Sequence, residues 1–261
     1  MSRMPIRRVQ SKRAKTDALL ADPELKAYIP ETRLFSRNTV NELLHKYGMI
    51  YVKPVSGTFG YGVIRLEWKA KYVLPYLLQS GERKFRFRSF DGMYRKLLRL
   101  KFRKRYICQQ GIELLKHEGR RFDFRVMVQH NLSSNWESTG IIGRLAHPRK
   151  IVTNYHNGGT PHPYETLMNG YFSDKEKMKS YRDTLTALGE KVAQTLEKAF
   201  PGIKEIGVDI AVDANLKPWI LEVNTLPDPF LFRKLPDAAV FRRIYRYAAA
   251  YGRFRRRTKG S

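Results

Sequence analysis

Two apolar runs near the end of the chain, residues 206–212 and 219–223, are joined by a short turn rich in Asp and Asn. Such a pair of runs predicts a β-hairpin. In the register that this turn sets, Asp209 lies opposite Glu222, and Asn224 shares a face with Glu222 through the strand period of two residues. The hairpin therefore predicts three oxygen-bearing side chains on one patch of a sheet.

This patch has two interpretations. Unpaired carboxylates at close range repel each other, and a hard cation such as Mg²⁺ accepts carboxylate and amide oxygens as ligands. On this interpretation Asp209, Glu222 and Asn224 form a metal site. The alternative is that either acid forms an ordinary ion pair with one of the chain's 50 Lys and Arg residues.

The rest of the chain predicts helices beside sheets. The longest helix is expected after the capping box Ser173-x-x-Glu176, with apolar positions every three or four residues up to Phe200. A shorter helix is expected between the N-cap Ser36 and Gly48, and a basic helix after Ser89. Strands are expected at residues 49–53, 62–66, 84–88, 106–109, 124–128 and 138–145. Helices combined with hairpin-rich sheets indicate an α+β fold.

A lysine and a glycine-rich loop follow the strand at residues 49–53. Lys53 ends that strand, and the loop contains Ser56, Gly57, Gly60 and Gly62. Small residues allow backbone N–H groups to approach a phosphate, and an ammonium group adds a point charge. The segment is not a Walker loop, because Gly-Lys-Ser/Thr is missing and a strand follows. The alternative is an ordinary glycine-rich hairpin.

Two arginines lie in the predicted strands of the second half. Asp123 and Arg125 share a face by the period of two residues, so Arg125 is placed either to clamp a phosphate or to form a cross-strand ion pair. Arg144 ends the next strand. The polar, glycine-bearing loop at residues 152–160 could offer backbone donors to an oxyanion.

Charge and cysteine content restrict the functional class. The formal net charge is +26, with basic clusters at residues 3–15, 83–105 and 242–259, which favours a polyanionic neighbour. The single cysteine, Cys108, excludes an intramolecular disulfide framework and suits a reducing compartment. No apolar run approaches a membrane span, and no signal-peptide core is found, so we expect a soluble, cytoplasmic protein.

The positive charge also suggests a nucleic-acid-binding protein. Phe85 and Phe87 alternate with basic residues, which places the rings on one face and the charges on the other. That pattern fits a core face better than a base-stacking platform. Nucleic acid is therefore disfavoured as a specific partner, and an incidental affinity for anionic polymers is the better expectation.

Taken in order, these segments resemble the YheC/YheD-type ATP-grasp proteins associated with bacterial endospore coats. The resemblance covers roughly residues 12–235. It implies two α+β lobes that hold ATP between their sheets. Most ligases of the superfamily also carry an N-terminal substrate domain, and we expect none in this sequence. The expected division is a basic arm and helix (1–30), a small lobe with the lid loop (31–112), a large lobe with the metal site (113–235), and a C-terminal helix with a basic tail (236–261). The matching stretches are residues 22–32, 51–54, 109–112, 122–125, 154–159 and 207–224.

The resemblance also implies roles for individual residues. Lys53 matches the lysine on the α- and β-phosphates, and residues 57–62 match a flexible lid. The remaining matches are Gln109, Gln110 and Ile112 for adenine; Glu113 or Glu118 for the ribose; Lys12 or Lys15 as a second lysine; Arg125 and Arg144 at the transferred phosphoryl group; Asn154, Gly158 and Gly159 on the acceptor side; and Asp209, Glu222 and Asn224 for the metal ion.

The implied activity is that of a carboxylate–amine or carboxylate–thiol ligase acting through an acyl phosphate. ATP and Mg²⁺ would be the cofactors, with Mn²⁺ as the alternative ion, and the carboxylate and acceptor are not identified by the sequence. The competing expectation is a nucleotide-binding structural component of the spore coat, whose basic clusters contact coat components or an anionic polymer.

Overall fold

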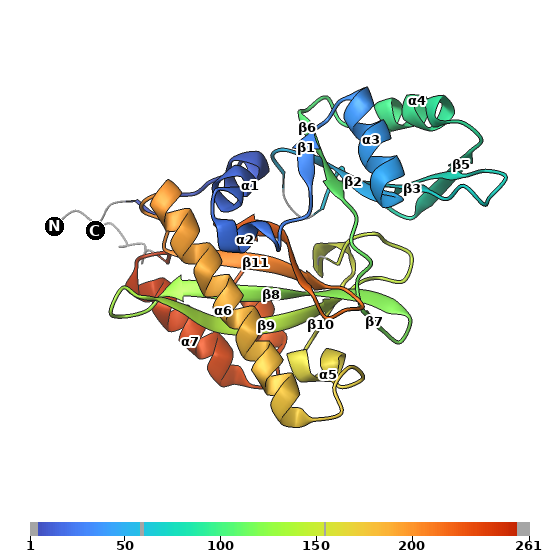
Figure 1. The fold of residues 1–261 in the computed structure, drawn as a ribbon. Helices are drawn as coiled ribbons and strands as arrows, with labels where there is room; N and C mark the ends of the chain where they lie inside the picture. Colours follow the sequence, from blue (N-terminus) through green and yellow to red (C-terminus); the bar gives the residue numbers. More distant parts are fainter. Residues whose placement is uncertain (1–4, 58–59, 154, 255–261) are drawn as a thin grey trace, which may run out of the picture.

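The chain folds into two lobes, each built on a sheet (Figure 1). The computed structural model describes residues 5–57, 60–153 and 155–254. The first sheet and its helices form the small lobe. The second sheet, longer and flanked by helices on both faces, forms the large lobe. The predicted α+β fold with two lobes is confirmed.

The small lobe is a six-stranded antiparallel sheet with the order β1-β6-β2-β3-β4-β5. Two helices pack on it, and their buried side chains join those of the strands in one apolar core. The rings of Phe85 and Phe87 pack against this core, as their alternation predicted. The elements are β1 (Thr32–Leu34), α3 (Arg37–Tyr47), β2 (Met49–Pro54), β3 (Ile64–Trp68), β4 (Tyr76–Ser80), β5 (Arg83–Phe87), α4 (Phe90–Leu100) and β6 (Tyr106–Gln110).

Local sequence determines where the two small-lobe helices begin and end. The Ser36 side chain accepts a hydrogen bond from the Thr39 backbone N–H at the start of α3, and Gly48 ends this helix at a φ of +69°. Ser89 caps α4 in the same way through the Gly92 N–H. All three predicted helix boundaries are confirmed.

The large lobe holds a five-stranded antiparallel path in the order β10-β9-β8-β11-β12, with β7 paired to β8. The predicted hairpin is formed by β11 and β12, and Asp209 lies opposite Glu222 as expected. A bulge immediately after Asp209 shifts the remaining pairs by one residue. The strands are β7 (Lys116–His117), β8 (Arg120–His130), β9 (Trp136–Leu145), β10 (Thr160–His162), β11 (Glu205–Val212) and β12 (Pro218–Asn224).

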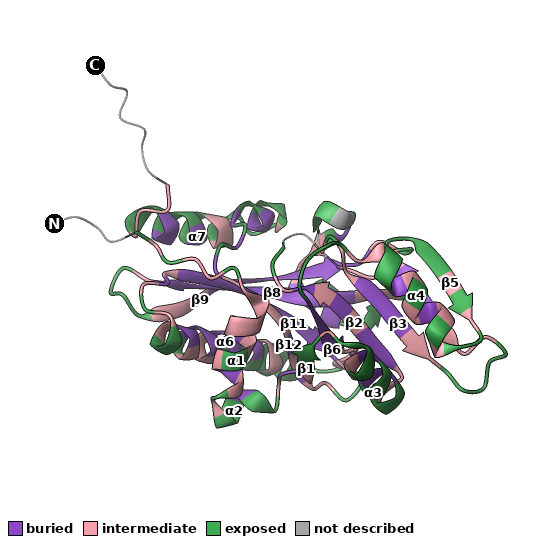
Figure 2. Ribbon diagram, turned by 90° about the horizontal axis from the view of Figure 1, so that it is seen from above, coloured by how far each residue is buried: buried purple, intermediate pink, exposed green. Residues whose placement is uncertain are grey.

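Helices cover the two faces of this sheet unequally (Figure 2). Helices α6 and α1 lie on one face, where the main core of the lobe is buried. Helix α7 and the short helix η2 lie on the other face and form a smaller core with Met127, Ile142 and Phe232. The helices are α1 (Lys12–Leu20), α2 (Pro23–Lys26), η1 (Tyr155–Asn157), α5 (Tyr164–Met168), α6 (Lys175–Ala199), η2 (Phe230–Lys234) and α7 (Ala238–Ala250).

The N-terminus of α6 differs from the prediction. The capping box assigned the N-cap to Ser173, but the cap is Asp174, whose carboxylate accepts a hydrogen bond from the Glu176 backbone N–H at 2.8 Å. Asp and Ser are about equally good caps, so the pattern alone does not choose between adjacent ones. In the structure, Asp174 has the extended backbone of an N-cap, with φ −117° and ψ 125°.

The period of two residues decides which large-lobe side chains face the small lobe. In β8, Phe122, Phe124 and Val126 enter the main core, so Asp123 and Arg125 lie on the opposite face. This face is shared with α7. Because α7 contacts β8 and β9 beside Met127 and Ile142, it leaves the end that carries Asp123 and Arg125 to the space between the lobes.

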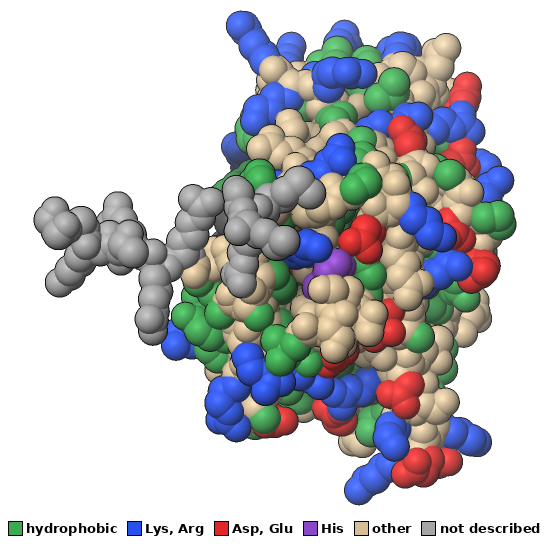
Figure 3. All heavy atoms as spheres, turned by 90° about the vertical axis from the view of Figure 1, so that its left-hand side faces the viewer, with side chains coloured by type: hydrophobic (Ala, Val, Ile, Leu, Met, Phe, Trp, Pro, Cys, Tyr) green, Lys and Arg blue, Asp and Glu red, His purple; other side chains and the backbone are tan. Residues whose placement is uncertain are grey.

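The described chain ends meet on the large lobe. Glu205, fully buried at the start of β11, contacts Arg8 at 2.8 Å and Arg253 at 2.6 Å. Figure 3 views the side of the molecule on which both ends lie, and Lys and Arg side chains are spread over much of it. In the described part of the chain, we find no helix that combines the length and the apolar character needed to cross a membrane.

Candidate active site

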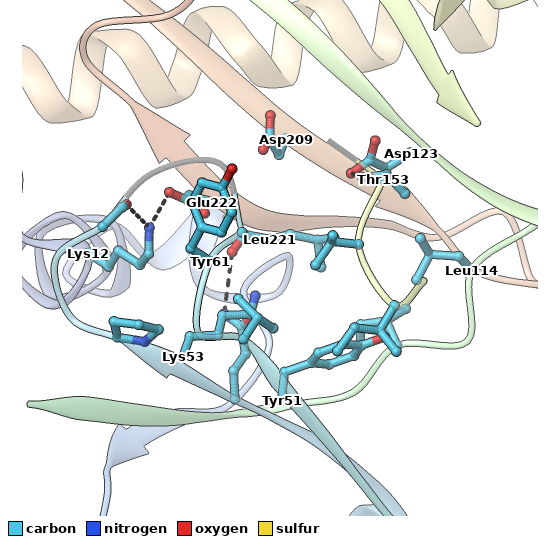
Figure 4. Close-up of a pocket in the computed structure, with 18 of the residues that line it drawn as sticks. Lys12, Tyr51, Lys53, Tyr61, Leu114, Asp123, Thr153, Asp209, Leu221 and Glu222 are labelled. Carbon is cyan, nitrogen blue, oxygen red and sulfur yellow. Dashed lines mark hydrogen bonds and ion pairs between the residues drawn. The ribbon is translucent and has the colours of Figure 1, made fainter. Parts of the chain in front are cut away.

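A cleft of about 800 Å³, open to solvent, lies between the two sheets (Figure 4). Lys53 and Tyr51 enter it from β2 of the small lobe, whereas Asp209 and Glu222 enter it from the large lobe. The cleft also has apolar walls. They are formed by Val63, Ile112, Leu114, Ile151, Val152 and Leu221.

Lys53 is the half-buried cation on the small-lobe side. Its ammonium donates a hydrogen bond to Oε1 of Gln109 on the neighbouring strand β6, at 2.5 Å. Desolvation lowers the pKa of Lys53 from 10.5 to about 8, and the carboxylates of Glu222 and Asp209 partly oppose this shift. The predicted amine therefore lies within the electrostatic reach of two predicted carboxylates across the cleft.

Opposite charges alternate across three strands of the large-lobe sheet. Asp209 on β11 contacts Arg125 at 2.5 Å and Arg144 at 3.0 Å. Arg144 also forms a two-point contact with Asp123, at 2.8 and 2.6 Å. Thr153 donates to the same carboxylate at 2.7 Å. Two of these ion pairs join residues that lie opposite each other in the sheet register, Asp209 with Arg125 and Asp123 with Arg144.

This network keeps Asp209 ionised. Burial by itself would raise the pKa of Asp209, but the guanidinium groups of Arg125 and Arg144 outweigh burial, so the pKa lies below its usual value. Gly207 makes room for the arrangement, because a Cβ at that position would lie 2.9 Å from Cδ of Arg125. The ion-pair alternative for Asp209 and Arg125 is thus observed, and it coexists with their place in the cleft walls.

Glu222 and Asn224 continue the polar face on β12. Lys12 donates to Oε1 of Glu222 at 2.5 Å and to the backbone oxygen of Gly57 at 3.1 Å. With its amide oriented to satisfy both neighbours, Asn224 donates to Oε1 of Glu222 at 3.3 Å and accepts from Nη2 of Arg125 at 3.2 Å. The three predicted oxygen-bearing side chains therefore belong to one connected polar cluster.

The expected adenine-side residues lie together, but the expected ribose carboxylate does not. Gln109, Gln110 and Ile112 all line the cleft. Glu113 does not line it: its carboxylate is exposed and lies 3.8 Å from Arg65 and 4.0 Å from Arg121 in an outer groove. The physical reason is that the side chain of Ile112 is turned into the protein, which turns that of the next residue outward.

The glycine-rich loop is brought to the cleft only in part. Gly57 and Gly60 line it, and Ser56 lines the adjoining cavity described below. Gly62 packs elsewhere: its φ is +74°, and a Cβ there would lie 2.6 Å from the Phe102 ring. Residues 58 and 59 lie outside the described residues.

The acceptor-side loop is also brought near the site only in part. Asn154, predicted for this loop, lies outside the described residues. Gly158 and Gly159 precede β10, and neither lines the two cavities of the site. His156, next to them in the chain, lines the adjoining cavity.

Comparison with known families gives the decisive observation. The model of the YheC/D-like ATP-grasp family matches residues 7–254, nearly the whole chain. This chain belongs to that family. The resemblance inferred from the motifs and the ATP-grasp fold are both confirmed.

Individual relatives of this ATP-grasp chain have low sequence identity to it. The chain is 28% identical to the endospore coat-associated protein YheD of Bacillus subtilis, over 87% of the chain and 51% of YheD. It is 22% identical to YheC of the same organism, over 77% of the chain and 55% of YheC. The chain thus spans about half the length of the curated relatives that it matches.

Solved structures support the fold. The crystal structure of the D-cycloserine synthetase DcsG has a TM-score of 0.54 at 13% identity, over 92% of this chain and 70% of DcsG. The D-alanine–D-alanine ligase from Coxiella burnetii has a TM-score of 0.51 at 14% identity, over 94% of this chain and 57% of the ligase. At these identities the likeness shows the ATP-grasp fold alone.

A second, larger cavity of about 1930 Å³ adjoins the cleft of the ATP-grasp chain. The two cavities share Lys12, Gly57, Gly60, Arg144 and Glu222 as lining residues. The second one extends from there toward the chain ends. Its further lining includes Arg8, Lys15, Lys104, Arg125, Asn224, residues 225–231 and Arg253.

Sequence reasoning did not assign a site role to Asp123 or Thr153. Asp123 shares a face with Arg125, and this period was visible in the sequence. Its bond to Arg144 depends on the β8–β9 register, which the sequence did not specify. Thr153 reaches the same carboxylate from a loop, so no local pattern could have identified it.

Proposed function

We propose that this chain binds ATP between its two sheets and acts as a carboxylate ligase that forms an acyl phosphate. The observation that carries the proposal is the position of Lys53, half-buried on the small lobe within electrostatic reach of Glu222 and Asp209 on the large lobe. A cation on one wall and a polar, acid-bearing cluster on the other match the needs of a nucleotide phosphate accompanied by a metal ion. The family and the ligase neighbours support the same assignment.

In this proposal, the apolar part of the cleft accepts the base. Gln109 and Gln110 provide hydrogen-bonding groups there, and Ile112 and Leu114 provide apolar surface. Pockets for flat heterocycles commonly combine apolar walls with a few polar groups in this way. The phosphates would then extend toward Lys53 and the loop at Gly57.

Of the two candidates for a second lysine, we assign Lys12. Its ammonium lies between Glu222 and the Gly57 backbone oxygen and lines the cleft. Lys15 does not line the cleft; it donates to the Val9 backbone oxygen and lines the adjoining cavity. Neither Glu113 nor Glu118 lines the cleft, so we assign no carboxylate to the ribose.

The polar cluster fits a divalent ion. Within the described residues, no group of three His, Cys, Asp or Glu side chains is placed to hold a metal ion. The predicted set consists instead of two carboxylates and one amide. Mg²⁺ is commonly held by one or two carboxylates together with substrate phosphates, which matches this set. Asp209, Glu222 and Asn224 would hold the ion, and when bound it would neutralise charge on the phosphate oxygens. Mn²⁺ accepts the same ligands.

The chain's own residues account for the transfer step. A carboxylate oxygen of the substrate attacks the γ-phosphorus, the bond to the β,γ-bridging oxygen breaks, and ADP leaves. Arg125 and Arg144, held in place by Asp209 and Asp123, stabilise the charge on the transferred phosphoryl group. An amine or thiol then attacks the acyl carbon, and inorganic phosphate leaves. No nucleophilic side chain is needed.

The test is release of ADP from ATP and Mg²⁺ in the presence of candidate carboxylates. Glu222→Gln should lower the rate of carboxylate-dependent ADP release by at least about tenfold, because losing even an indirect partner of a metal ion lowers activity this much. Glu165→Gln is the matched control, since Glu165 forms an exposed ion pair with Arg182 outside the cleft. Equal rates for both variants would contradict the proposed metal site.

A second candidate function rests on the names of the relatives. YheD and YheC are named endospore coat-associated proteins, so we also consider a nucleotide-binding structural component of the coat. This candidate predicts that ATP and Mg²⁺ raise the melting temperature without any release of ADP, whichever carboxylate is supplied. ADP release that depends on the added carboxylate would exclude this candidate.

A further inference from the structure

The larger cavity beside the cleft is lined by two pairs of arginines. At the end shared with the cleft lie Arg125 and Arg144, which contact Asp209. At the other end lie Arg8 and Arg253, which contact Glu205. Glu205 and Asp209 are four residues apart on β11 and face the same side, so their Cα atoms lie about 13 Å apart at 3.3 Å per residue. We take this as the approximate spacing of the two arginine pairs that contact them.

The far arginine pair has positive charge in excess. Two guanidinium groups share the single carboxylate of Glu205, whereas near the cleft two arginines are balanced by Asp123 and Asp209. Nη1 of Arg253 donates to Glu205, and Nη2 donates to the Pro227 backbone oxygen. A guanidinium has five N–H donors, so donors remain for a ligand.

Two lysines add to this charge along the walls. Lys15, on α1, is 5% exposed, and within the described residues its ammonium has one hydrogen bond, to the Val9 backbone oxygen. Burial lowers its pKa from 10.5 to about 8, although Glu222 partly opposes the shift. Lys104 is exposed and lines the cavity from the small lobe. The other side is formed by residues 225–231, which include exposed Leu226 and Phe230.

We propose that this cavity binds an acidic oligopeptide of at least about four residues, and that one of its carboxyl groups is the one phosphorylated. A single amino acid cannot reach both arginine pairs, because an extended chain covers about 3.3–3.6 Å per residue and 13 Å requires about four residues. A peptide with several carboxylates can place one at Arg125 and Arg144 and another at Arg8 and Arg253. This inference rests on the proposed ligase function for its reacting end, but the binding itself does not.

The experiment measures the binding of oligo-L-glutamates of one to six residues by calorimetry, and ADP release with the same peptides, ATP and Mg²⁺. The Kd should fall by about tenfold or more between two and four residues and change little beyond that. Lys104→Glu should raise the Kd for hexaglutamate several-fold. Arg103→Glu is the matched control, because Arg103 is an exposed neighbour outside the cavity.

A second pair of variants tests the cavity without changing charge. Leu226→Trp should weaken hexaglutamate binding by filling the wall, while Leu132→Trp should not, since Leu132 is equally exposed but lies in the β8–β9 turn. Equal loss from Arg103→Glu and Lys104→Glu would overturn the proposal, because it would indicate general attraction to a basic surface.

The outcomes separate the two proposals. Length-dependent binding without ADP release supports the peptide cavity and contradicts the ligase. ADP release that depends on a single amino acid, with no binding of hexaglutamate, supports the ligase and overturns the peptide cavity.

Discussion

At the residue scale, most charges of the cleft are compensated by a direct contact with a side chain of opposite charge. Asp209 contacts two arginines and Glu222 contacts Lys12. Lys53 is different, because its ammonium donates to the neutral amide of Gln109. Desolvation in the cleft disfavours the charged ammonium, which is why the pKa of Lys53 is lowered to about 8.

This lowered pKa predicts that nucleotide binding is lost in alkaline solution. Lys53 must be protonated to attract phosphate, so the affinity for ATP should fall as the pH rises through about 8. Lys53→Arg retains its charge, and its affinity should stay flat to about pH 10. Titration calorimetry from pH 6.5 to 10 makes the comparison, and a parallel decline in both proteins would contradict the assignment.

The same group has the opposite effect on stability. Between pH 8 and 10.5 the unfolded chain still binds the lysine proton that the folded chain has released, so the contribution of Lys53 to the free energy of unfolding rises with pH. Lys53→Met should remove the part of this rise that is due to Lys53 and leave the part due to Lys15, whose pKa is also lowered to about 8, as measured by urea unfolding at pH 8 and 10. Lys177→Met, at an exposed position of α6, should leave it unchanged.

At the element scale, neighbouring residues decide where helices start, and packing decides between close alternatives. Ser36, Gly48 and Ser89 bound α3 and α4 as their residue types indicate. At α6 two adjacent residues are both good caps, and the structure selects Asp174. The error of one residue arises because both choices satisfy the same local rule.

The α6 cap can be tested directly. Asp174→Ala should lower the free energy of unfolding by about 1 kcal/mol, the usual cost of a lost N-cap. Ser173→Ala should change it very little, because the side chain that bonds to the Glu176 N–H is that of Asp174. Chemical denaturation of both variants measures the difference, and a larger loss for Ser173→Ala would restore the capping box.

At the scale of the whole molecule, both chain ends are fastened to one buried carboxylate. Arg8 and Arg253 come from opposite ends of the sequence and contact Glu205. The Tyr251 hydroxyl also donates to this carboxylate at 2.7 Å. The ends therefore stabilise the edge of the larger cavity through a contact that links residues 245 positions apart.

Removing the C-terminal half of this contact should destabilise the whole chain. Arg253→Gln should lower the free energy of unfolding by about 2 kcal/mol, because a hydrogen bond to a buried charge is lost. Arg242→Gln, at an exposed position on α7, should have a negligible effect. Thermal unfolding followed by circular dichroism compares them, and equal melting temperatures would show that Arg8 and Tyr251 suffice for Glu205.

Local patterns in the sequence determined the elements of this protein and one part of its site. Alternation and turn residues were enough for the β11–β12 hairpin and for the pairing of Asp209 with Glu222, because a short turn sets the register of its own strands. The cap and stop residues were enough for α3 and α4. The glycine-rich loop was correctly located between β2 and β3.

Tertiary structure alone decided which residues meet between distant segments. Arg144 reaches Asp209 across the intervening strand β8, and Lys12 reaches Glu222 across 210 positions. Glu113, one of two carboxylates that the resemblance offered for the ribose, turned away from the cleft. A short turn couples neighbours along the chain and can be read from residue types. Contacts between lobes and chain ends depend on how the two sheets pack, which no local pattern encodes.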